Sequence, residues 1–190
     1  MDRLETVLRS FYKYFSSYPA KWRDVLQDYS ECSTALCNEI EQLQLIKSVG
    51  DKKLKILEIP LLKQNLLGKI YAAIETEVQL LNKLVKDCSS LNQELQDKCD
   101  TVRRACDEVE TVPLQGSPTV PSAALLIEWI EDVSRYYHTL YLQLSSPLNQ
   151  LSYEDPNYMS LLKEAAKEDP NLKEHIERIM AYTQYMIMEN

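Results

Sequence analysis

A hydrophobic seam, in which apolar residues recur alternately three and four positions apart, runs from about residue 67 to 109 and most constrains the fold. Such spacing places the seam on one stripe of a single long helix. At about 1.5 Å per residue, this helix would be roughly 65 Å long and should pack lengthwise against partner helices. The seam residues are Leu67, Ile70, Ile74, Leu81, Leu84, Cys88, Leu91, Leu95, Val102, Ala105 and Val109, with polar Glu77 and Lys98 at the two remaining positions.

The composition favours an all-α fold. Only 3 of the 190 residues are glycine, and Leu, Glu, Lys, Gln and Ala dominate the long segments. Sustained alternating runs of Val, Ile and Thr, which are typical of strands, are missing. We therefore predict an elongated antiparallel helical bundle with a long coiled-coil-like helix and a smaller C-terminal helical part.

Prolines and turn residues divide the chain. Residues 51–59 are ambiguous between a short extended piece and a helical turn, and Pro60 can open the long helix, predicted to span 60–111. Thr111–Pro121 contains three prolines and a glycine and is the clearest linker. Other helices are predicted at 2–16, from Pro19 to near Gly50, at 123–144 with Pro147 ending it, at 156–167, and from Asp169-Pro170 onward. The predicted parts are an N-terminal hairpin or bundle at 1–111, a linker at 112–121 and C-terminal helices at 122–190 that pack on the bundle.

Charge and hydropathy exclude some function classes. The chain has 21 basic and 29 acidic residues, a net charge of −8, and it would repel a phosphate backbone. We therefore expect no direct nucleic-acid binding. The N-terminal pattern is amphipathic and no run of 18 apolar residues occurs, so we expect neither a signal peptide nor a membrane span. An odd number of cysteines, five, predicts reduced thiols in the cytosol or nucleus.

No pattern for catalysis is visible in the sequence. His138 and His175 have no Cys, Asp or Ser partner at a recognisable spacing, and three scattered glycines cannot form a phosphate-binding loop. The cysteines lack the tight paired spacing of a zinc site, and we expect buried structural thiols at Cys32, Cys37, Cys88, Cys99 and Cys106. The sequence therefore predicts neither an enzyme nor a cofactor or metal site.

Twelve tyrosines are unusual for a purely internal core, because a buried phenol still needs a hydrogen-bond partner. The tyrosines form an early and a late cluster: Tyr12, Tyr14, Tyr18 and Tyr29, then Tyr136, Tyr137, Tyr141, Tyr153 and Tyr158. They are explained either by ordinary amphipathic packing or by two surfaces that dock partners. Ser117-Pro118 and Ser146-Pro147 match proline-directed phosphorylation sites in exposed turns, a dipeptide that is also common by chance.

The segment Pro121–Leu142 resembles the corresponding helix of the AIRIM family, the AFG-two-interacting ribosome maturation factors. Upstream of it, an early aromatic helix, a Trp22-containing helix and a leucine-rich helix opening around Ile59-Pro60 follow in the same order, so the similarity spans about residues 3–145. The matching positions in the segment are Pro121, Ser122, Glu128, Trp129, Asp132, Arg135, Tyr137, Tyr141 and Leu142.

The resemblance implies a non-enzymatic adaptor subunit of a complex built on hexameric AAA-type ATPases. Such a subunit would act with a small coiled-coil partner in late maturation of the large ribosomal subunit, contact the pre-60S particle indirectly, serve replisome protein turnover, and reside in cytoplasm and nucleus. The resemblance also implies partner-binding residues at Glu128, Trp129, Asp132, Arg135, Tyr137 and Tyr141.

Other interpretations of the same residues stay open. The apolar face of the 123–144 helix can simply close the bundle, and its charged face can lie in solvent. The seam can be covered within the chain, by self-association or by a heterologous helix. A different class of function, a structural coiled-coil subunit of an unrelated tethering or kinetochore-like assembly, fits the same periodicity.

Overall fold

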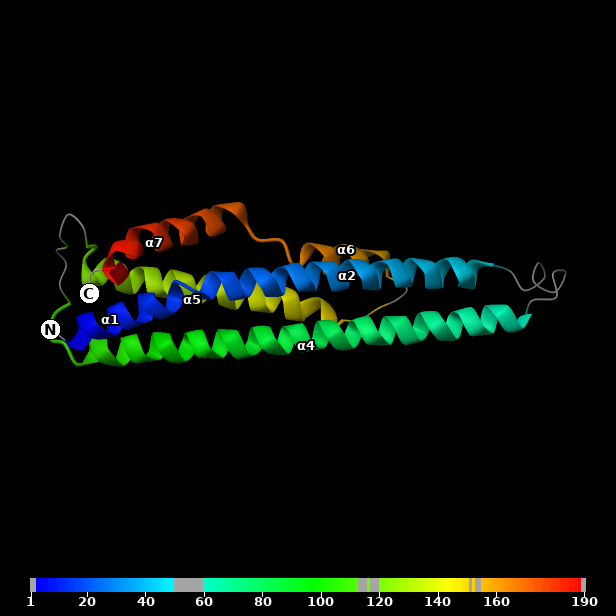
Figure 1. The fold of residues 1–190 in the computed structure, drawn as a ribbon, viewed down its shortest axis with the longest axis horizontal. Helices are drawn as coiled ribbons and strands as arrows, with labels where there is room; N and C mark the ends of the chain where they lie inside the picture. Colours follow the sequence, from blue (N-terminus) through cyan, green and yellow to red (C-terminus); the bar gives the residue numbers. More distant parts are fainter. Residues whose placement is uncertain are drawn as a thin grey trace. The chain divides into compact units, whose positions relative to one another are not determined.

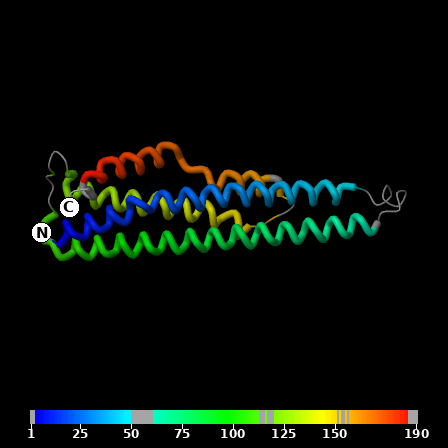
Figure 2. Tube along the Cα trace, in the orientation of Figure 1, coloured from blue at the N-terminus to red at the C-terminus, as the bar shows by residue number. Residues whose placement is uncertain are grey.

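The computed structural model describes residues 3–49, 60–112, 116, 120–150, 152 and 155–188, and within these ranges the chain is helical and has no strand (Figures 1 and 2). The all-α class and the helical bundle are therefore confirmed. The helices are α1 (Arg3–Phe15), α2 (Tyr18–Ser48), α4 (Pro60–Asp107), α5 (Ala123–Leu148), α6 (Pro156–Glu164) and α7 (Pro170–Met188). The ambiguous segment 51–59, Ser117-Pro118 and Tyr153 lie outside the described residues.

The chain forms two compact units. Unit 1 comprises Met1–Asp24, Cys88–Leu142 and Glu168–Asn190, and unit 2 comprises Val25–Asp87 and Gln143–Lys167. Each unit joins segments that are far apart in the sequence and has its own core.

Helix α4 confirms the predicted long helix, which begins at Pro60 as expected, although it ends at Asp107 and leaves Val109 beyond it. The amide of Val109 bonds to the carbonyl of Cys106 at 3.1 Å, three residues back, which marks a tightened last turn. Acidic Asp107 and Glu108 at this end oppose the helix dipole and disfavour continuation.

Of the thirteen predicted seam positions, seven are buried and one is exposed. The five that are half-buried are Leu67, Glu77, Leu84, Leu91 and Val109. Ile70, Ile74, Leu81, Cys88, Leu95, Val102 and Ala105 are buried, whereas Lys98 is exposed and Cys99 occupies the buried position beside it. Steps of four and then three residues lead from Leu95 through Cys99 to Val102, so the same periodicity admits the apolar neighbour. The prediction of Lys98 in the seam was therefore wrong: its Nζ atom lies 5.6 Å from the ring centre of Tyr14.

Helix α5 runs past the predicted end at residue 144 and contains Pro147 in its last turn. A proline there removes only one backbone donor, so the cost is smaller than in the middle of a helix. In unit 2, the hydroxyl of buried Tyr29 donates to the Leu144 carbonyl at 3.0 Å, which anchors this end of α5 on α2. Ser146 is exposed, within a helix rather than in the expected turn.

The core of unit 1 is a chain of stacked and edge-on aromatic rings contributed by α1, the start of α2, and α5. The ring of Tyr137 lies 4.8 Å from that of Tyr18, at 89°, and 5.2 Å from that of Trp22. An edge-to-face pair such as Tyr18–Tyr137 stabilises the fold beyond what the burial of its apolar area contributes. The members of this aromatic cluster, all buried, are Phe11, Tyr12, Phe15, Tyr18, Trp22, Tyr136 and Tyr137.

Buried Tyr12, Tyr18 and Tyr29 satisfy their hydroxyls on helix backbones. In unit 1, Tyr12 donates to the Leu126 carbonyl at 2.6 Å and Tyr18 donates to the Leu91 carbonyl at 3.0 Å. Packing therefore explains most of the early tyrosine cluster, in which only Tyr14 is half-exposed.

The five cysteines are free thiols, and Cys37, Cys88 and Cys99 are buried, which confirms the structural interpretation for these three. Burial raises the pKa of Cys99 to about 11, so its thiol is neutral at physiological pH. Cys32 and Cys106 are half-buried, and burial raises their pKa values as well.

We predict that Tyr12→Phe lowers the free energy of unfolding by about 1 kcal/mol, because it removes one buried hydrogen bond while keeping the ring. Urea denaturation at neutral pH measures this change. Tyr182→Phe is the matched control, since the Tyr182 side chain is 60% exposed. An equal loss in both variants would contradict the role of the Tyr12 bond.

We also predict a steep loss of stability in alkali. Burial raises the pKa values of Tyr12, Tyr18, Tyr136 and Tyr137, so above about pH 10 the unfolded chain releases protons that the folded chain retains. The stabilisation is therefore fully present below this pH and falls as the pH rises. Unfolding curves across the alkaline range test this, and Tyr12→Phe should make the fall shallower; a decline of unchanged slope would contradict it.

Candidate partner-binding face

Unit 1 places the six motif residues of α5 in three different environments. Glu128 and Arg135 are exposed on the outer face of the helix, and Trp129, Asp132 and Tyr141 are half-buried. Tyr137 is only 3% exposed and belongs to the aromatic cluster. The helix therefore brings five of the six to or near the surface, while Tyr137 contributes to the core.

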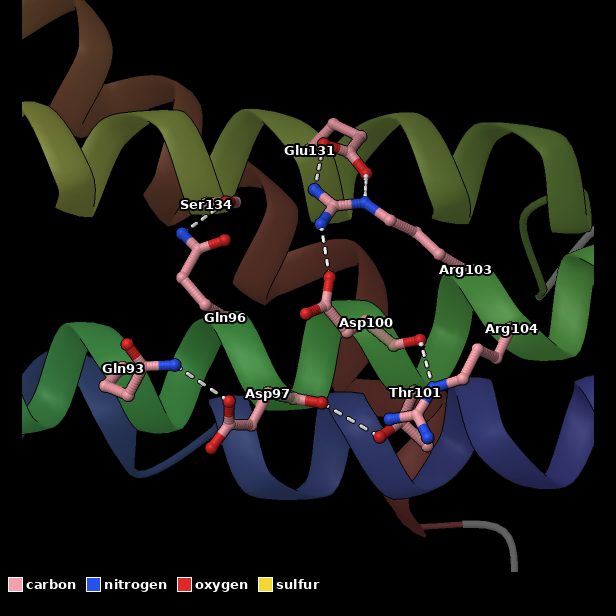
Figure 3. Close-up of polar contacts among 9 residues, drawn as sticks. All are labelled: Gln93, Gln96, Asp97, Asp100, Thr101, Arg103, Arg104, Glu131 and Ser134. Atoms are coloured by element: carbon pink, nitrogen blue, oxygen red, sulfur yellow. Dashed lines mark hydrogen bonds and ion pairs between the residues drawn. The ribbon is translucent and has the colours of Figure 1, made fainter.

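Polar contacts with α4 fix the rotation of α5, as Figure 3 shows. Arg103 donates from Nε and Nη2 to the two carboxylate oxygens of Glu131, both at 2.8 Å, and from Nη1 to Asp100 at 2.7 Å. One turn along α5, Gln96 donates to the hydroxyl of Ser134 at 2.9 Å. Exposed Glu128 and Arg135 lie beside this contact, on the side of α5 opposite buried Tyr137.

Helix α7 covers the flank of α5 through polar and aromatic contacts. His175 Nε2 lies 2.9 Å from the Asp132 carboxylate, and the ring of Tyr182 stacks on that of Trp129 at 5.8 Å and 20°. Just before α7, the Glu168 carboxylate accepts hydrogen bonds from the Tyr136 hydroxyl at 2.6 Å and from the Lys173 ammonium at 2.7 Å. Two of the motif residues, Trp129 and Asp132, are thus shared between the outer surface and α7.

A groove between α5 and α7 adjoins the exposed motif residues. It encloses about 340 Å³ and is lined by Asp132, Arg135, Tyr136, Thr139, Leu172, His175 and Ile176. Its apolar floor and charged rim are suited to an apolar side chain of a partner flanked by charged groups. Two further cavities, of about 360 and 230 Å³, also border α7.

His175 and Tyr182 belong to this face, although no sequence pattern indicates it. At a recognisable spacing His175 has no Cys, Asp or Ser partner, whereas in the structure its partner is Asp132, 43 residues away in the sequence. Local spacing carries no signal for such a contact. Tyr182 lies beside the buried stripe of α7, and the sequence could identify it only as an exposed aromatic residue.

Potential metal ligands and histidines do not converge in the part of the chain that the structure describes. No group of three His, Cys, Asp or Glu side chains in this part of the chain is arranged to hold a metal ion. In the same ranges, every helix is too short or too polar to traverse a bilayer. His138 lies 3.4 Å from the amide of Asn92 rather than beside a nucleophile.

We predict a coupling energy of about 1 kcal/mol between Arg103 and Glu131, since two-pronged ion pairs are at the upper end of surface pairs. A double-mutant cycle with Arg103→Ala and Glu131→Ala, measured by urea denaturation, gives this value. The pair Arg135 and Asp132, which is a single contact at 3.7 Å, is the internal comparison and should couple less. If the losses of unfolding free energy in the Arg103→Ala and Glu131→Ala variants are additive, the structural role of the Arg103–Glu131 ion pair is contradicted.

Comparison with known proteins identifies relatives with modest identity. The AFG2-interacting ribosome maturation factor of Xenopus tropicalis is 27% identical over 128 residues, which cover 65% of this chain and 63% of that protein. The protein of the same name from Mus musculus is 26% identical over 159 residues, 80% of this chain and 73% of that protein. The one from Homo sapiens is 25% identical over 140 residues, 70% and 69% respectively. The chain thus spans less than two thirds of the Xenopus relative's length.

A family model extends the similarity beyond the range of 3–145 inferred from the motif. The model CA109-like, described as "Ribosome biogenesis protein C1orf109-like", matches residues 2–185 and so includes α6 and most of α7. The resemblance carried by α5 is therefore confirmed. The chain belongs to this family of ribosome biogenesis proteins.

Proposed function

We propose that this chain is a non-enzymatic helical adaptor in ribosome maturation, which binds an AFG2-type AAA ATPase through the face formed by α5 and α7. The observation that carries the proposal is the family match over residues 2–185, together with the name of the relatives, "AFG2-interacting ribosome maturation factor". In this role the ATPase supplies the mechanical work, and the chain positions it on its substrate.

The geometry of unit 1 supports a binding role for this face. Exposed Glu128 and Arg135 present charges of opposite sign beside the α5–α7 groove, and Trp129 and Tyr182 add a stacked aromatic pair at its edge. Arginine and aromatic residues are the side chains that contribute most binding energy at protein interfaces. The five motif residues at or near the surface are therefore proposed partner contacts, and Tyr137 is proposed to support them from the core.

The thiols and histidines support the non-enzymatic part of the proposal. Burial raises the pKa values of Cys32, Cys37, Cys99 and Cys106, so these thiols are poor nucleophiles at neutral pH. The groove between α5 and α7 holds one histidine, and that histidine is engaged by Asp132.

The remaining parts of the proposal concern partners and location. We propose that the chain also binds a small coiled-coil partner, contacts the pre-60S particle indirectly, and resides in the cytoplasm and the nucleus. A role in replisome protein turnover follows from the same ATPase partnership and is part of the proposal. None of these needs a catalytic group in this chain.

We predict that Arg135→Glu weakens binding to the AFG2-type ATPase by at least about tenfold, because it reverses a charge at the rim of the groove. Purified full chain and ATPase, titrated by biolayer interferometry at physiological salt, measure the dissociation constant. Lys83→Glu is the control, an equal charge reversal at an exposed position of α4 in unit 2. Matching thermal midpoints of the two variants exclude unfolding as the cause.

Two results would contradict the proposal. If the wild-type chain fails to bind the ATPase and does not co-migrate with pre-ribosomal particles on a gradient, the adaptor role is wrong and a structural coiled-coil role is favoured. If binding occurs but Arg135→Glu and Lys83→Glu behave alike, the face on α5 and α7 is wrong.

A further inference from the structure

Helix α4 carries a second row of side chains in unit 2, which shares half-buried Glu77 and Leu84 with the predicted seam and otherwise lies beside it. Successive members are four, three, four, four, three and four residues apart, which confines them to a strip about 80° wide on a helix of 3.6 residues per turn. This spacing is the one by which two helices pack lengthwise. The members of the row, which we call the α4 outer row, are Leu62, Leu66, Lys69, Ala73, Glu77, Leu80 and Leu84.

The α4 outer row is only partly covered in the described part of unit 2. Leu62, Leu66 and Leu80 are 50%, 40% and 42% exposed, while Ile70, Ile74 and Leu81 on the neighbouring face are buried in the core. Single exposed leucines are ordinary on protein surfaces. A regular row of them at helix-packing spacing is different, because four leucines lie at the two ends of one strip about 33 Å long, with Lys69, Ala73 and Glu77 between them.

The order of residues along the row is symmetric about Ala73. When two copies of the row are laid antiparallel with Ala73 opposite Ala73, Leu62 lies opposite Leu84 and Leu66 opposite Leu80. In the same alignment, Lys69 lies opposite Glu77, and the two-fold axis makes this pair occur twice. The small side chain at the centre lets the two helix backbones approach closely.

We propose that a second copy of this chain docks antiparallel on the α4 outer row. Each copy carries a net charge of −8, which opposes association, so an apolar edge alone would be disfavoured between two copies. The two Lys69–Glu77 pairs offset this repulsion at the contact and select the antiparallel register.

A second copy explains the row better than a helix of another protein does. A helix of another protein could also cover the leucines. Binding to such a helix would not require that the row match a second, antiparallel copy of itself, with leucine opposite leucine and Lys69 opposite Glu77. A symmetric contact of this kind buries the same patch on both copies and closes at two subunits. The inference uses only residues of unit 2 and does not depend on the proposed ATPase partner.

Charge exchange at the row tests the proposal with the full chain. We expect sedimentation equilibrium at micromolar concentrations to show a wild-type dimer. Lys69→Glu and Glu77→Lys should each raise the dimer dissociation constant by at least about tenfold, because each places like charges opposite one another twice. The double variant Lys69→Glu/Glu77→Lys should return it to near the wild-type value, and so should an equimolar mixture of the two single variants.

Controls keep a folding defect separate from a contact defect. Lys83→Glu changes the charge by the same amount as Lys69→Glu at an exposed position outside the row, and it should leave the dimer intact. Circular dichroism and thermal midpoints should show that all variants remain helical. A monomeric wild-type chain, or single variants that the double variant and the mixture do not rescue, would overturn the proposal, as would dimers that all variants leave unchanged.

Discussion

A phenol hydroxyl inside a helical bundle must find an acceptor, and this constraint governs how the helices of the protein are set against one another. Backbone carbonyls are present all along a helix, but each points along the axis and accepts only from a narrow range of directions. When Tyr12 donates to Leu126 and Tyr18 donates to Leu91, the rotations of α4 and α5 relative to the first two helices are specified together. Leucine side chains alone would leave these rotations less well defined, because dispersion has little directionality.

The rotation of α5 decides which part of the motif is available to a partner. Tyr137 turns inward onto Tyr18 and Trp22, and this orientation requires Glu128 and Arg135 to face solvent. A motif shared with relatives therefore combines two physical roles on one helix, since the inward residues hold the outward ones in place. Sequence resemblance identifies the set, while only burial separates its supporting members from its exposed ones.

Helix periodicity made the class of fold, the long helix and its opening proline predictable from the sequence, because these depend on local spacing. The choice between Lys98 and Cys99 was not predictable from spacing alone, since steps of three and four residues lead from Leu95 to Val102 through Lys98, and steps of four and three lead there through Cys99. The cost of burying an ammonium decides between them. His175 and Asp132 are brought together by the docking of α7, which no local pattern encodes. The α5 motif was visible as a set, but the groove beside it was not, because Leu172 and Ile176 come from another helix.

The cavities along α7 have a consequence for the accessibility of α5. These grooves are open to solvent, so α7 makes fewer packing contacts with its neighbours than a fully packed helix would. The contacts His175–Asp132 and Glu168–Tyr136, which join this segment to α5, are also polar, and water can replace them at small net cost. Amide hydrogens of α7 should therefore exchange with deuterated solvent through local opening sooner than those of α1, and each opening briefly uncovers the indole of Trp129.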